Sequence, residues 1–411
     1  MIFASKSHGG FSGDLKNFRR ENLLAGMLLI FAFALRLIFI FHYRVNSDEP
    51  QHLHVVWAWA HGFLPYRDVF DNHSPLFSLL WAPVFNFFGE RVDIVSWMRL
   101  TELPCYVLSL WAVFRIASTL FDRRTGLWAT VLAALWPVFF FGSLEFRPDG
   151  LWAACWLLAL AVLIEGQVTL GRGFIVGFLL GITMAISMKT ILMLIALGVG
   201  LTVAMIVAGR NGRKFSFARL SACLAAAVAG FLILPVGVVL FFASKNALGP
   251  LFYGTIGHNL LAHSASHISL WLRALYFLAA FVSLVCMAFI IFRRSGAMAI
   301  GGRRVLIFVT TLTYFLLLVC FWPIIEREHY LPFYPLLMVL LAGAIFSLPR
   351  GEPKWHVPKF ILPVSLAVLE LCWVIGMDQP WRNRTTAESR LLADVLTLTD
   401  PTDTIMDKKG E

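Results

Sequence analysis

Apolar residues occur along most of the chain in blocks long enough to cross a membrane, and short polar segments separate these blocks. A bilayer core about 30 Å thick needs roughly 20 predominantly apolar residues per helix, so each block predicts one spanning helix. The predicted fold is therefore all-α, a polytopic transmembrane helical bundle of about 11 spans. These spans are expected at residues 22–43, 95–117, 125–144, 150–165, 172–187, 190–208, 217–243, 270–292, 304–324, 330–348 and 358–376.

One further apolar block, residues 76–88, is short for a crossing and contains Pro83. Lys and Arg gather in the cytoplasmic loops of membrane proteins, so the later loops indicate whether this block crosses. If it does not cross, all the basic clusters fall on the side of the N-terminus. The clusters lie at 123–124, 172, 210–219, 293–304 and 350–359. We therefore predict that 76–88 is re-entrant or interfacial and that the N-terminus is cytoplasmic.

This topology divides the chain into three parts. They are a cytoplasmic segment at 1–21, a transmembrane domain at 22–377 with its first periplasmic loop at 44–94, and a short periplasmic tail at 378–411. Within the tail, 386–398 has a helical pattern, and 400–406 has the pattern of a turn followed by a short strand. Because the tail has little to pack on, we expect it to be poorly ordered. It is either naturally short or the start of a larger outside domain.

The composition agrees with a membrane protein and excludes soluble, disordered and fibrous classes. Hydrophobic residues make up 59% of the 411 residues and charged residues 14%, whereas a soluble chain carries about 25% charged residues. The net charge of +10 is explained by the basic inside loops. Nucleic acid is not an expected partner, because no basic stripe interleaves with exposed aromatic residues.

The first outside loop holds the most informative polar residues. Asp48 and Glu49 follow the first span by a few residues. Burial and a neighbouring like charge at the membrane boundary can raise a carboxyl pKa, which suits a general base. An alternative is that Asp48 and Gln51 form a capping box, with Pro50 in the first turn of an interfacial amphipathic helix over 49–61. The two interpretations are compatible.

Four histidines in this loop, His52, His54, His61 and His73, suggest a metal site. Their spacing matches no known ligand pattern, so a metal is not indicated, although a divalent ion remains possible. We expect no cofactor.

The polar string of this loop resembles that of a known enzyme family. The string consists of Asp48-Glu49, His52, His54, Trp57, Gly62, Pro65-Tyr66-Arg67-Asp68 and Asn72-His73-Ser74-Pro75-Leu76. It is similar to the first outside loop of polyprenyl-phosphate-sugar-dependent glycosyltransferases of GT-C fold. This superfamily contains the dolichyl-phosphate-mannose protein mannosyltransferases and the aminoarabinose lipid A transferases. The resemblance covers the first ~100 residues well and the later spans by their pattern.

The resemblance implies a reaction and a location. The reaction is inverting transfer of a hexose or pentose from a polyprenyl monophosphate to a hydroxyl or amine, at the periplasmic face of a cell inner membrane. Asp48 would be the base, Glu49 would support it, and Asp149 in the next outside loop would be a second catalytic acid. Within the first loop, His54, Arg67, Asp68 and His73 are candidate substrate-binding residues. The acceptor would be a lipid, a protein or a glycan.

Other candidates lie in the later outside turns. Lys189 separates two apolar runs with no acidic residue near it in sequence, which suits a phosphate ligand, and the alternative is snorkelling to lipid headgroups. Arg327, His329 and Tyr330 precede a Leu-Pro-rich span and are candidate phosphate or sugar contacts. The alternative there is an ion pair of Arg327 with a neighbouring glutamate.

Two local alternatives concern helix starts and helix faces. Asp149 also fits an N-cap of a span that begins at Gly150. Arg99 and Glu102, three residues apart, also fit an intrahelical ion pair.

Two rival functions remain beside the enzyme. A transporter or flippase of a lipid-linked sugar predicts charged residues that face one another near the bilayer midplane. A noncatalytic membrane scaffold leaves the clustered outside polar residues unexplained. Most acidic residues are predicted at one membrane face, which favours chemistry on that side.

Overall fold

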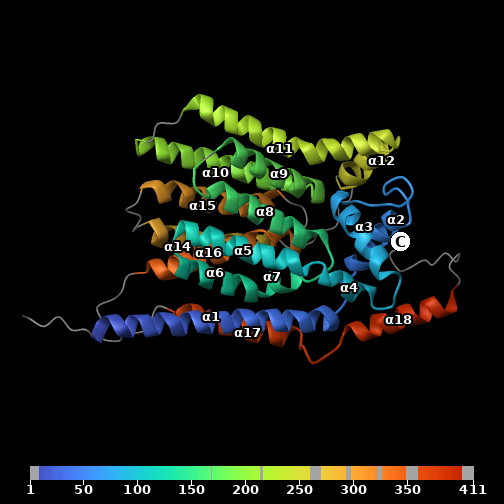
Figure 1. The fold of residues 1–411 in the computed structure, drawn as a ribbon, viewed down its shortest axis with the longest axis horizontal. Helices are drawn as coiled ribbons and strands as arrows, with labels where there is room; N and C mark the ends of the chain where they lie inside the picture. Colours follow the sequence, from blue (N-terminus) through green and yellow to red (C-terminus); the bar gives the residue numbers. More distant parts are fainter. Residues whose placement is uncertain are drawn as a thin grey trace, which may run out of the picture.

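The computed structural model describes residues 9–167, 169–212, 216–259, 270–292, 298–321, 326–348 and 360–399. Within these ranges the chain is almost wholly helical, and the one β-type pairing is an isolated bridge between Pro65 and Val69. This confirms the predicted all-α fold class. Figure 1 shows the long helices running side by side as a bundle, with the short α2, α3 and α12 gathered at one end.

The helices follow the predicted blocks closely. In chain order they are α1 (Gly9–His42), α2 (Asp48–Ala60), α3 (Leu76–Phe88), α4 (Ile94–Leu100), α5 (Leu103–Leu120), α6 (Arg123–Leu135), α7 (Pro137–Gly142), α8 (Pro148–Ile164), α9 (Leu170–Ile186), α10 (Thr190–Arg210), α11 (Phe217–Ser244), α12 (Leu248–Phe252), η1 (Tyr253–His258), α14 (Leu270–Phe292), α15 (Met298–Phe321), η2 (Arg327–Tyr330), α16 (Phe333–Ser347), α17 (Ile361–Met377) and α18 (Thr385–Leu398).

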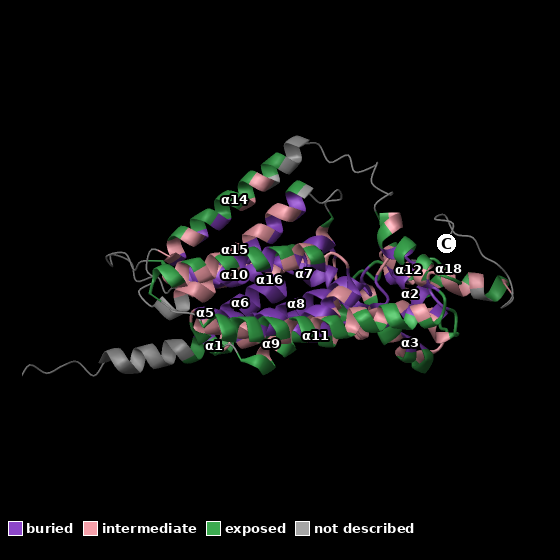
Figure 2. Ribbon diagram, turned by 90° about the horizontal axis from the view of Figure 1, so that it is seen from above, coloured by how far each residue is buried: buried purple, intermediate pink, exposed green. Residues whose placement is uncertain are grey.

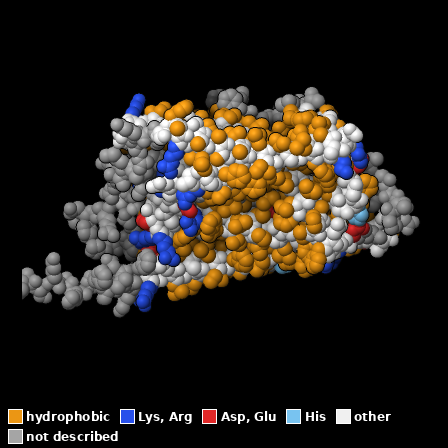
Figure 3. Space-filling view, turned by 45° about the horizontal axis from the view of Figure 1, so that its top comes forward, with side chains coloured by type: hydrophobic (Ala, Val, Ile, Leu, Met, Phe, Trp, Pro, Cys, Tyr) orange, Lys and Arg blue, Asp and Glu red, His pale blue; other side chains and the backbone are white. Residues whose placement is uncertain are grey.

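Within the described residues, five helical segments are long and apolar enough to span a membrane by themselves. They are Arg19–His42, Ile94–Leu120, Thr190–Arg210, Phe217–Ser244 and Gly301–Cys320. Six further apolar helices, α3 among them, are shorter. The count of about 11 spans therefore stays a prediction. Figure 3 shows a broad apolar belt between two ends that carry the charged side chains, as expected for a multi-pass membrane protein.

Two predicted spans are each broken into two helices. The block predicted at 95–117 forms α4 and α5, and Pro104 lies in the first turn of α5. The block predicted at 125–144 forms α6 and α7, with an extended Trp136 before Pro137. Proline has no N–H and is tolerated in the first turn of a helix, so both prolines lie where a new helix begins.

Both ends of α3 lie at the same end of the bundle, as predicted for a segment that does not cross. Before α3, the ring of His73 lies 4.5 Å from that of His52 on α2. After α3, Glu90 accepts a hydrogen bond from Trp57 Nε1 at 2.6 Å, also on α2. Helix α2 therefore contacts the chain on both sides of α3.

The opposite end of the bundle carries the described basic residues at the starts of α6 and α15, and the cluster predicted at 350–359 lies outside the described residues. Arg124 forms an ion pair with Glu21 of α1 at 2.7 Å. Arg304 donates to the carbonyl of Leu120, and Arg303 donates to that of Gly166. Loops far apart in sequence thus meet at one end, as the charge pattern predicts. That this end is cytoplasmic stays a prediction.

Buried residues concentrate on α6, α8 and α16 in the middle of the bundle, whereas α11 and α14 are largely exposed (Figure 2). Helix α11 is held against α9 by close backbone contact. A Cβ added to Gly173, Gly177 or Gly181 of α9 would lie 1.8–2.7 Å from a backbone oxygen of α11. Small residues spaced by four allow such contact where no hydrophobic effect drives the helices together.

The tail is better anchored than predicted. Helix α18 covers most of the segment predicted as helical, and the chain before it binds the end of α1. Arg384 N donates to the carbonyl of His42 at 2.9 Å, and Thr385 Oγ1 donates to that of Tyr43 at 2.8 Å. This segment therefore has a packing partner at the end of α1, which the sequence did not reveal, and the order of the tail stays a prediction. The strand predicted at 400–406 lies outside the described residues.

The α9–α11 contact predicts that Gly177→Ala destabilises the protein by about 1–3 kcal/mol, as expected for overpacking. The added Cβ would lie 1.8 Å from the carbonyl oxygen of Ala227, and backbone must move to admit it. The matched control is Gly198→Ala on α10, where nothing lies within 4 Å of the added Cβ. Thermal unfolding in detergent, followed by circular dichroism, measures both. Equal midpoints for the two variants would contradict the close packing.

Candidate active site

Glu49 and Arg99 form a fully buried ion pair at the end of the bundle. Arg99 Nε and Nη2 donate to the two carboxylate oxygens of Glu49 at 2.7 and 2.6 Å, and both side chains are 0% exposed. The remaining Arg99 donors reach the carbonyls of Tyr43 and Arg44. Arg99 therefore pairs with Glu49 and not, as the spacing suggested, with Glu102.

Glu49 also fixes the two polar loops beside it. Its oxygens accept from the backbone N–H of Asn46 at 2.8 Å and from that of Phe146 at 2.8 Å. A carboxylate that accepts four hydrogen bonds while fully buried has no lone pair left for a proton from substrate. The geometry therefore makes Glu49 a positioning residue that ties α4 to the loops before α2 and α8.

Arg147 lies at the centre of the charged cluster. Its guanidinium is 2.9 Å from Glu328, 3.1 Å from Asp48, 3.4 Å from Asp149 and 3.7 Å from Glu145. Burial alone would lower the pKa of Arg147, but these carboxylates, led by Asp149, raise it above the ordinary value. Arg147 thus stays charged and joins the first outside loop, the start of α8 and η2.

Asp48 is the first residue of α2, and its side chain is 32% exposed. The helix begins as predicted, but the capping box is absent: Ser47 is the N-cap and makes no side-chain cap. Instead, Asn46 Oδ1 accepts from the Asp48 N–H at 3.1 Å. Among the acids around Arg147, Asp48 has the most accessible carboxylate, since Glu145, Asp149 and Glu328 are buried.

Asp149 and Lys189 pair at 2.9 Å, between the starts of α8 and α10. Asp149 lies in the first turn of α8, after Pro148, and is not its N-cap. The helix dipole favours an acid there. Lys189 thus has an acidic partner that its sequence neighbourhood does not reveal. Trp152 supports the pair, because its Nε1 donates to Thr190 and its ring faces Lys189 Nζ at 5.4 Å.

Arg327 pairs with Glu145, which also accepts from Asn46 Nδ2 at 2.9 Å. The predicted alternative, an ion pair of Arg327 with a neighbouring glutamate, is therefore replaced by a contact with a glutamate 182 residues away in the chain. Burial raises the pKa of Glu145 to about 7, although Arg327 opposes the shift. A hydrogen bond to Glu328 raises the pKa of Glu326 as well. Glu145 and Glu326 therefore bind a proton more tightly than ordinary glutamates.

A second group of residues borders the cluster through His52. Burial, together with His73 and Arg147, lowers the pKa of His52 well below its ordinary value. His73 Nδ1 lies 3.2 Å from Asp71, whose carboxylate is also bound to the His73 N–H at 3.0 Å. The neutral His52 and the oriented His73 thus form the side of the site that faces α3.

Of the other predicted binding residues, His54, Arg67 and Asp68 lie on the surface, whereas His329 and Tyr330 are buried, and His329 lies close enough to Asp149 to act on its charge. His54 is exposed and stacks on Trp57, and Arg67 and Asp68 pair with each other at 2.8 Å on the surface. His329 is buried, and its carbonyl accepts from Tyr314 at 2.8 Å. Tyr330 is buried among the rings of α15 and α16, with Phe333 at 6.3 Å.

The sequence interpretation did not select Arg147, Glu145 or Glu328 as site residues. Their signal was present: charged residues flanking apolar helices are costly unless they are paired or used. The pattern of apolar and charged residues along the sequence did not show which loops lie next to one another. In the described part of the chain, no three of His, Cys, Asp and Glu are grouped to hold a metal ion.

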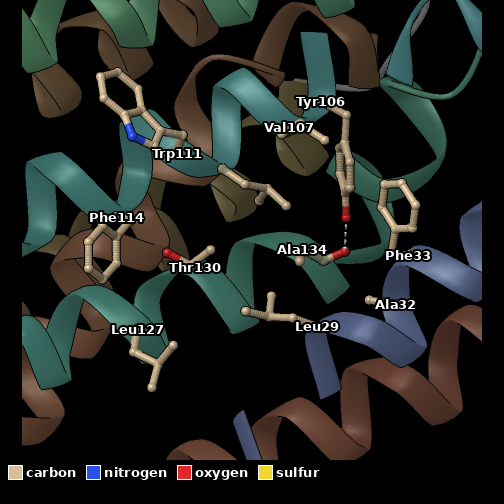
Figure 4. Close-up of a pocket in the computed structure, with 11 residues that line it drawn as sticks. Leu29, Ala32, Phe33, Tyr106, Val107, Trp111, Phe114, Leu127, Thr130 and Ala134 are labelled. Carbon is tan, nitrogen blue, oxygen red and sulfur yellow. Dashed lines mark hydrogen bonds between the residues drawn. The ribbon is translucent and has the colours of Figure 1, made fainter. Parts of the chain in front are cut away.

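An apolar pocket of about 340 Å³ lies between α1, α5 and α6 (Figure 4), and none of the residues of this cluster lines it. Its walls include Phe33, Tyr106 and Trp111, and the Tyr106 hydroxyl donates to the carbonyl of Ala134 at 2.7 Å. No charged side chain lines it, so it does not offer a position for a phosphate.

The buried pair predicts that Glu49→Gln destabilises the protein by about 3–5 kcal/mol, because it leaves Arg99 buried without a counter-charge. The matched control is Asp93→Asn, which breaks an exposed pair with Arg91 and should cost under about 1 kcal/mol. Chemical denaturation in mixed micelles compares the two. A Glu49→Gln variant as stable as Asp93→Asn would show that the buried ion pair of Glu49 and Arg99 does not stabilise the fold.

The raised pKa of Glu145 predicts that the stability of the protein depends on pH. Its pKa is about 7 in the folded protein, against an ordinary value of 4.5. The unfolded chain releases the proton first, so this group's contribution is largest below about pH 4.5 and is lost as the pH rises to about 7. Glu145→Gln cannot ionise and should gain up to roughly 3 kcal/mol relative to the wild type across this window.

Thermal unfolding at several pH values between about 5 and about 8 measures this difference. The control is Glu388→Gln, an exposed glutamate of α18. Parallel curves for wild type and Glu145→Gln would show that Glu145 ionises as an ordinary carboxyl.

The site's sequence and fold can be compared with known proteins. Residues 72–239 match the family model for dolichyl-phosphate-mannose-protein mannosyltransferases. The matched segment contains Arg99, Arg147, Asp149 and Lys189, and it begins after Asp48. Comparison with the curated proteins gives no match.

Solved structures share the fold. ArnT from Cupriavidus metallidurans bound to undecaprenyl phosphate superposes with a TM-score of 0.59 at 14% identity, covering 88% of this chain and 73% of that one. The apo state of the same protein superposes with a TM-score of 0.60 at 13% identity, covering 89% of this chain and 74% of that one. The apo form of the Archaeoglobus fulgidus oligosaccharyltransferase superposes with a TM-score of 0.50 at 14% identity, covering 92% of this chain and 58% of that one. The chain therefore has the GT-C fold of membrane glycosyltransferases, and its residues 72–239 are similar to the dolichyl-phosphate-mannose-protein mannosyltransferase family.

Proposed function

We propose that the chain transfers a sugar from a polyprenyl monophosphate to a hydroxyl or amine of a lipid, protein or glycan. The observation that carries this proposal is the accessible Asp48 carboxylate at the rim of a buried cluster of cations, at one end of an apolar bundle. The likeness of the fold to ArnT bound to undecaprenyl phosphate supports a lipid-phosphate donor.

Asp48 is the proposed base. It takes the proton from the acceptor, and the acceptor oxygen or nitrogen forms a bond to the anomeric carbon of the sugar. The bond from that carbon to the phosphate oxygen breaks, and its electron pair leaves with the lipid phosphate. Attack opposite the leaving group inverts the anomeric carbon. The roles of base and leaving group follow general acid–base chemistry.

The leaving phosphate gains negative charge, which preorganised cations stabilise best in a site that excludes water. Lys189 and Arg327 are the proposed phosphate ligands, and His329 and His73 are proposed to contact the phosphate or sugar. Lys189 and Arg327 are paired with Asp149 and Glu145 in this structure. We infer that Asp149 and Glu145 hold these cations in place before the donor arrives.

Glu49 takes a positioning role in this proposal, because its carboxylate is fully used by Arg99 and by backbone N–H groups. His54, Arg67 and Asp68 lie on the exposed part of the first loop and are assigned to acceptor contact. The sidedness follows the charge pattern: the basic end is cytoplasmic and the site faces the periplasm of an inner membrane.

The described ion pairs favour transfer over transport. They lie at the two ends of the bundle, for example Arg147–Asp48 at one end and Arg124–Glu21 at the other. A flippase would need such pairs along a path through the middle of the membrane. No pair in the described ranges lies on such a path.

We predict that Asp48→Asn lowers transfer by at least about 100-fold, the usual size of a general-base contribution. The assay uses membranes supplied with labelled polyprenyl-phosphate sugars and measures label in the acceptor fraction. Asp93→Asn, an exposed acid of the same outside segment, is the matched control and should retain transfer. Undiminished transfer by Asp48→Asn would remove the proposed base. Movement of the donor across vesicles without cleavage would favour the transporter.

A further inference from the structure

The apolar pocket between α1, α5 and α6 has no part in the proposed reaction, yet it opens onto the membrane (Figure 4). Some of its lining residues are buried, such as Tyr106 and Ala134, whereas Phe33 and Trp111 are 38% and 48% exposed. Phe33 and Trp111 belong to the apolar segments Arg19–His42 and Ile94–Leu120. The pocket is therefore a groove on the lipid-facing side of the bundle.

The groove runs along the helices. Figure 4 shows Phe114 and Leu127 at one end of it and Phe33 and Tyr106 at the other. On α5 its lining extends from Tyr106 to Phe114, about 12 Å along the axis of an α-helix. A long apolar groove with aromatic walls, open to lipid along its side, suits one hydrocarbon chain lying parallel to the helices.

Arg123 lies just beyond the Leu127 end of the groove. It is the first residue of α6 and is exposed. Residues four apart share a helix face, so Arg123 lies on the face of α6 that carries Leu127. Arg19, also exposed, begins the apolar segment of α1 at the same end of the bundle. Both arginines thus lie where apolar segments start, at the depth of the lipid headgroups.

The acids beside these arginines already have partners. The Asp122 carboxylate accepts from a backbone N–H in the first turn of α6 at 2.7 Å, as the N-cap of that helix. Glu21 forms its ion pair with Arg124 at 2.7 Å. Within the residues that the structure describes, neither Arg19 nor Arg123 forms an ion pair. The end of the groove is therefore positively charged and complementary to a phosphate.

We propose that the groove binds an anionic phospholipid from the membrane leaflet at the basic end of the bundle. One acyl chain lies in the groove, and Arg123, with Arg19 beside it, holds the phosphate just beyond the uncharged lining. The cluster around Arg147 lies at the opposite end, so this site is separate from the proposed donor site. Basic residues attract anionic lipids at the cytoplasmic surface, which is the side predicted for this end.

Thermal unfolding of the full-length protein in dodecyl maltoside tests the site, because a ligand of the folded state raises the midpoint. We expect dioleoylphosphatidylglycerol to raise it by about 2 °C or more beyond dioleoylphosphatidylcholine. Arg123→Gln should weaken the apparent affinity for the anionic lipid by about fivefold. The matched control is Arg210→Gln, an exposed arginine at the end of α10, a helix that does not line the groove. It should respond like the wild type.

The acyl chain has its own test. Val107 lines the groove and is 46% exposed, so Val107→Trp should fill the groove and reduce the shift while leaving Arg123 unchanged. If Val107→Trp does not fold, Arg123→Gln still decides, since it changes only an exposed side chain.

Four outcomes would overturn the proposal. An equal shift with the uncharged phosphatidylcholine would mean general lipid solvation, and an equal loss in Arg123→Gln and Arg210→Gln would mean general attraction to the basic end. The same shift with glycerol phosphate would mean an anion site that needs no acyl chain. A midpoint that rises with protein concentration instead of with lipid would assign the groove to a second copy of the chain.

Discussion

The buried pair of Glu49 and Arg99 is the interaction on which the site depends. Taking two charges out of water costs several kcal/mol per ion, so such a pair persists only with good geometry and full hydrogen bonding. Both conditions hold: two parallel N–H···O bonds join the side chains, and backbone groups satisfy the rest. The pair fixes α4, the loop before α2 and the loop before α8 as one unit.

The position of the cluster follows from that unit. Because Glu49 binds the N–H of Phe146, the residues on either side, Glu145 and Arg147, are directed into the space between α2, α8 and η2. Pro148 then begins α8, and Asp149 occupies its first turn. The starts of α2, α8 and α10 meet here, so acids at helix N-termini and cations between helices neutralise one another.

The membrane explains the remaining organisation. Apolar helices in lipid gain little from hiding apolar side chains, so close backbone contact and polar groups at the ends decide which helices meet. Helices α9 and α11 meet through glycines, and the end of α1 meets the tail through the carbonyls of His42 and Tyr43. The carbonyl of Tyr43 also accepts from Arg99, so the tail and the buried pair share an anchor.

The sequence by itself determined the helices and the sorting of charge to two ends, and it predicted that 76–88 does not cross. These features depend on local properties, namely block length, proline position and loop charge. It also selected Asp48, Asp149, Lys189 and Arg327 as exceptional, because charges next to apolar helices need a partner or a use.

Only the tertiary structure decided the partners. Arg99 pairs with Glu49 across fifty residues and Arg327 with Glu145 across 182, so sequence spacing suggested nearer and wrong partners. Arg147 is one charged residue of a short loop until four carboxylates from three chain segments surround it. Ion pairing depends on distance in space, and a pattern along the chain does not specify which loops of a helical bundle come together.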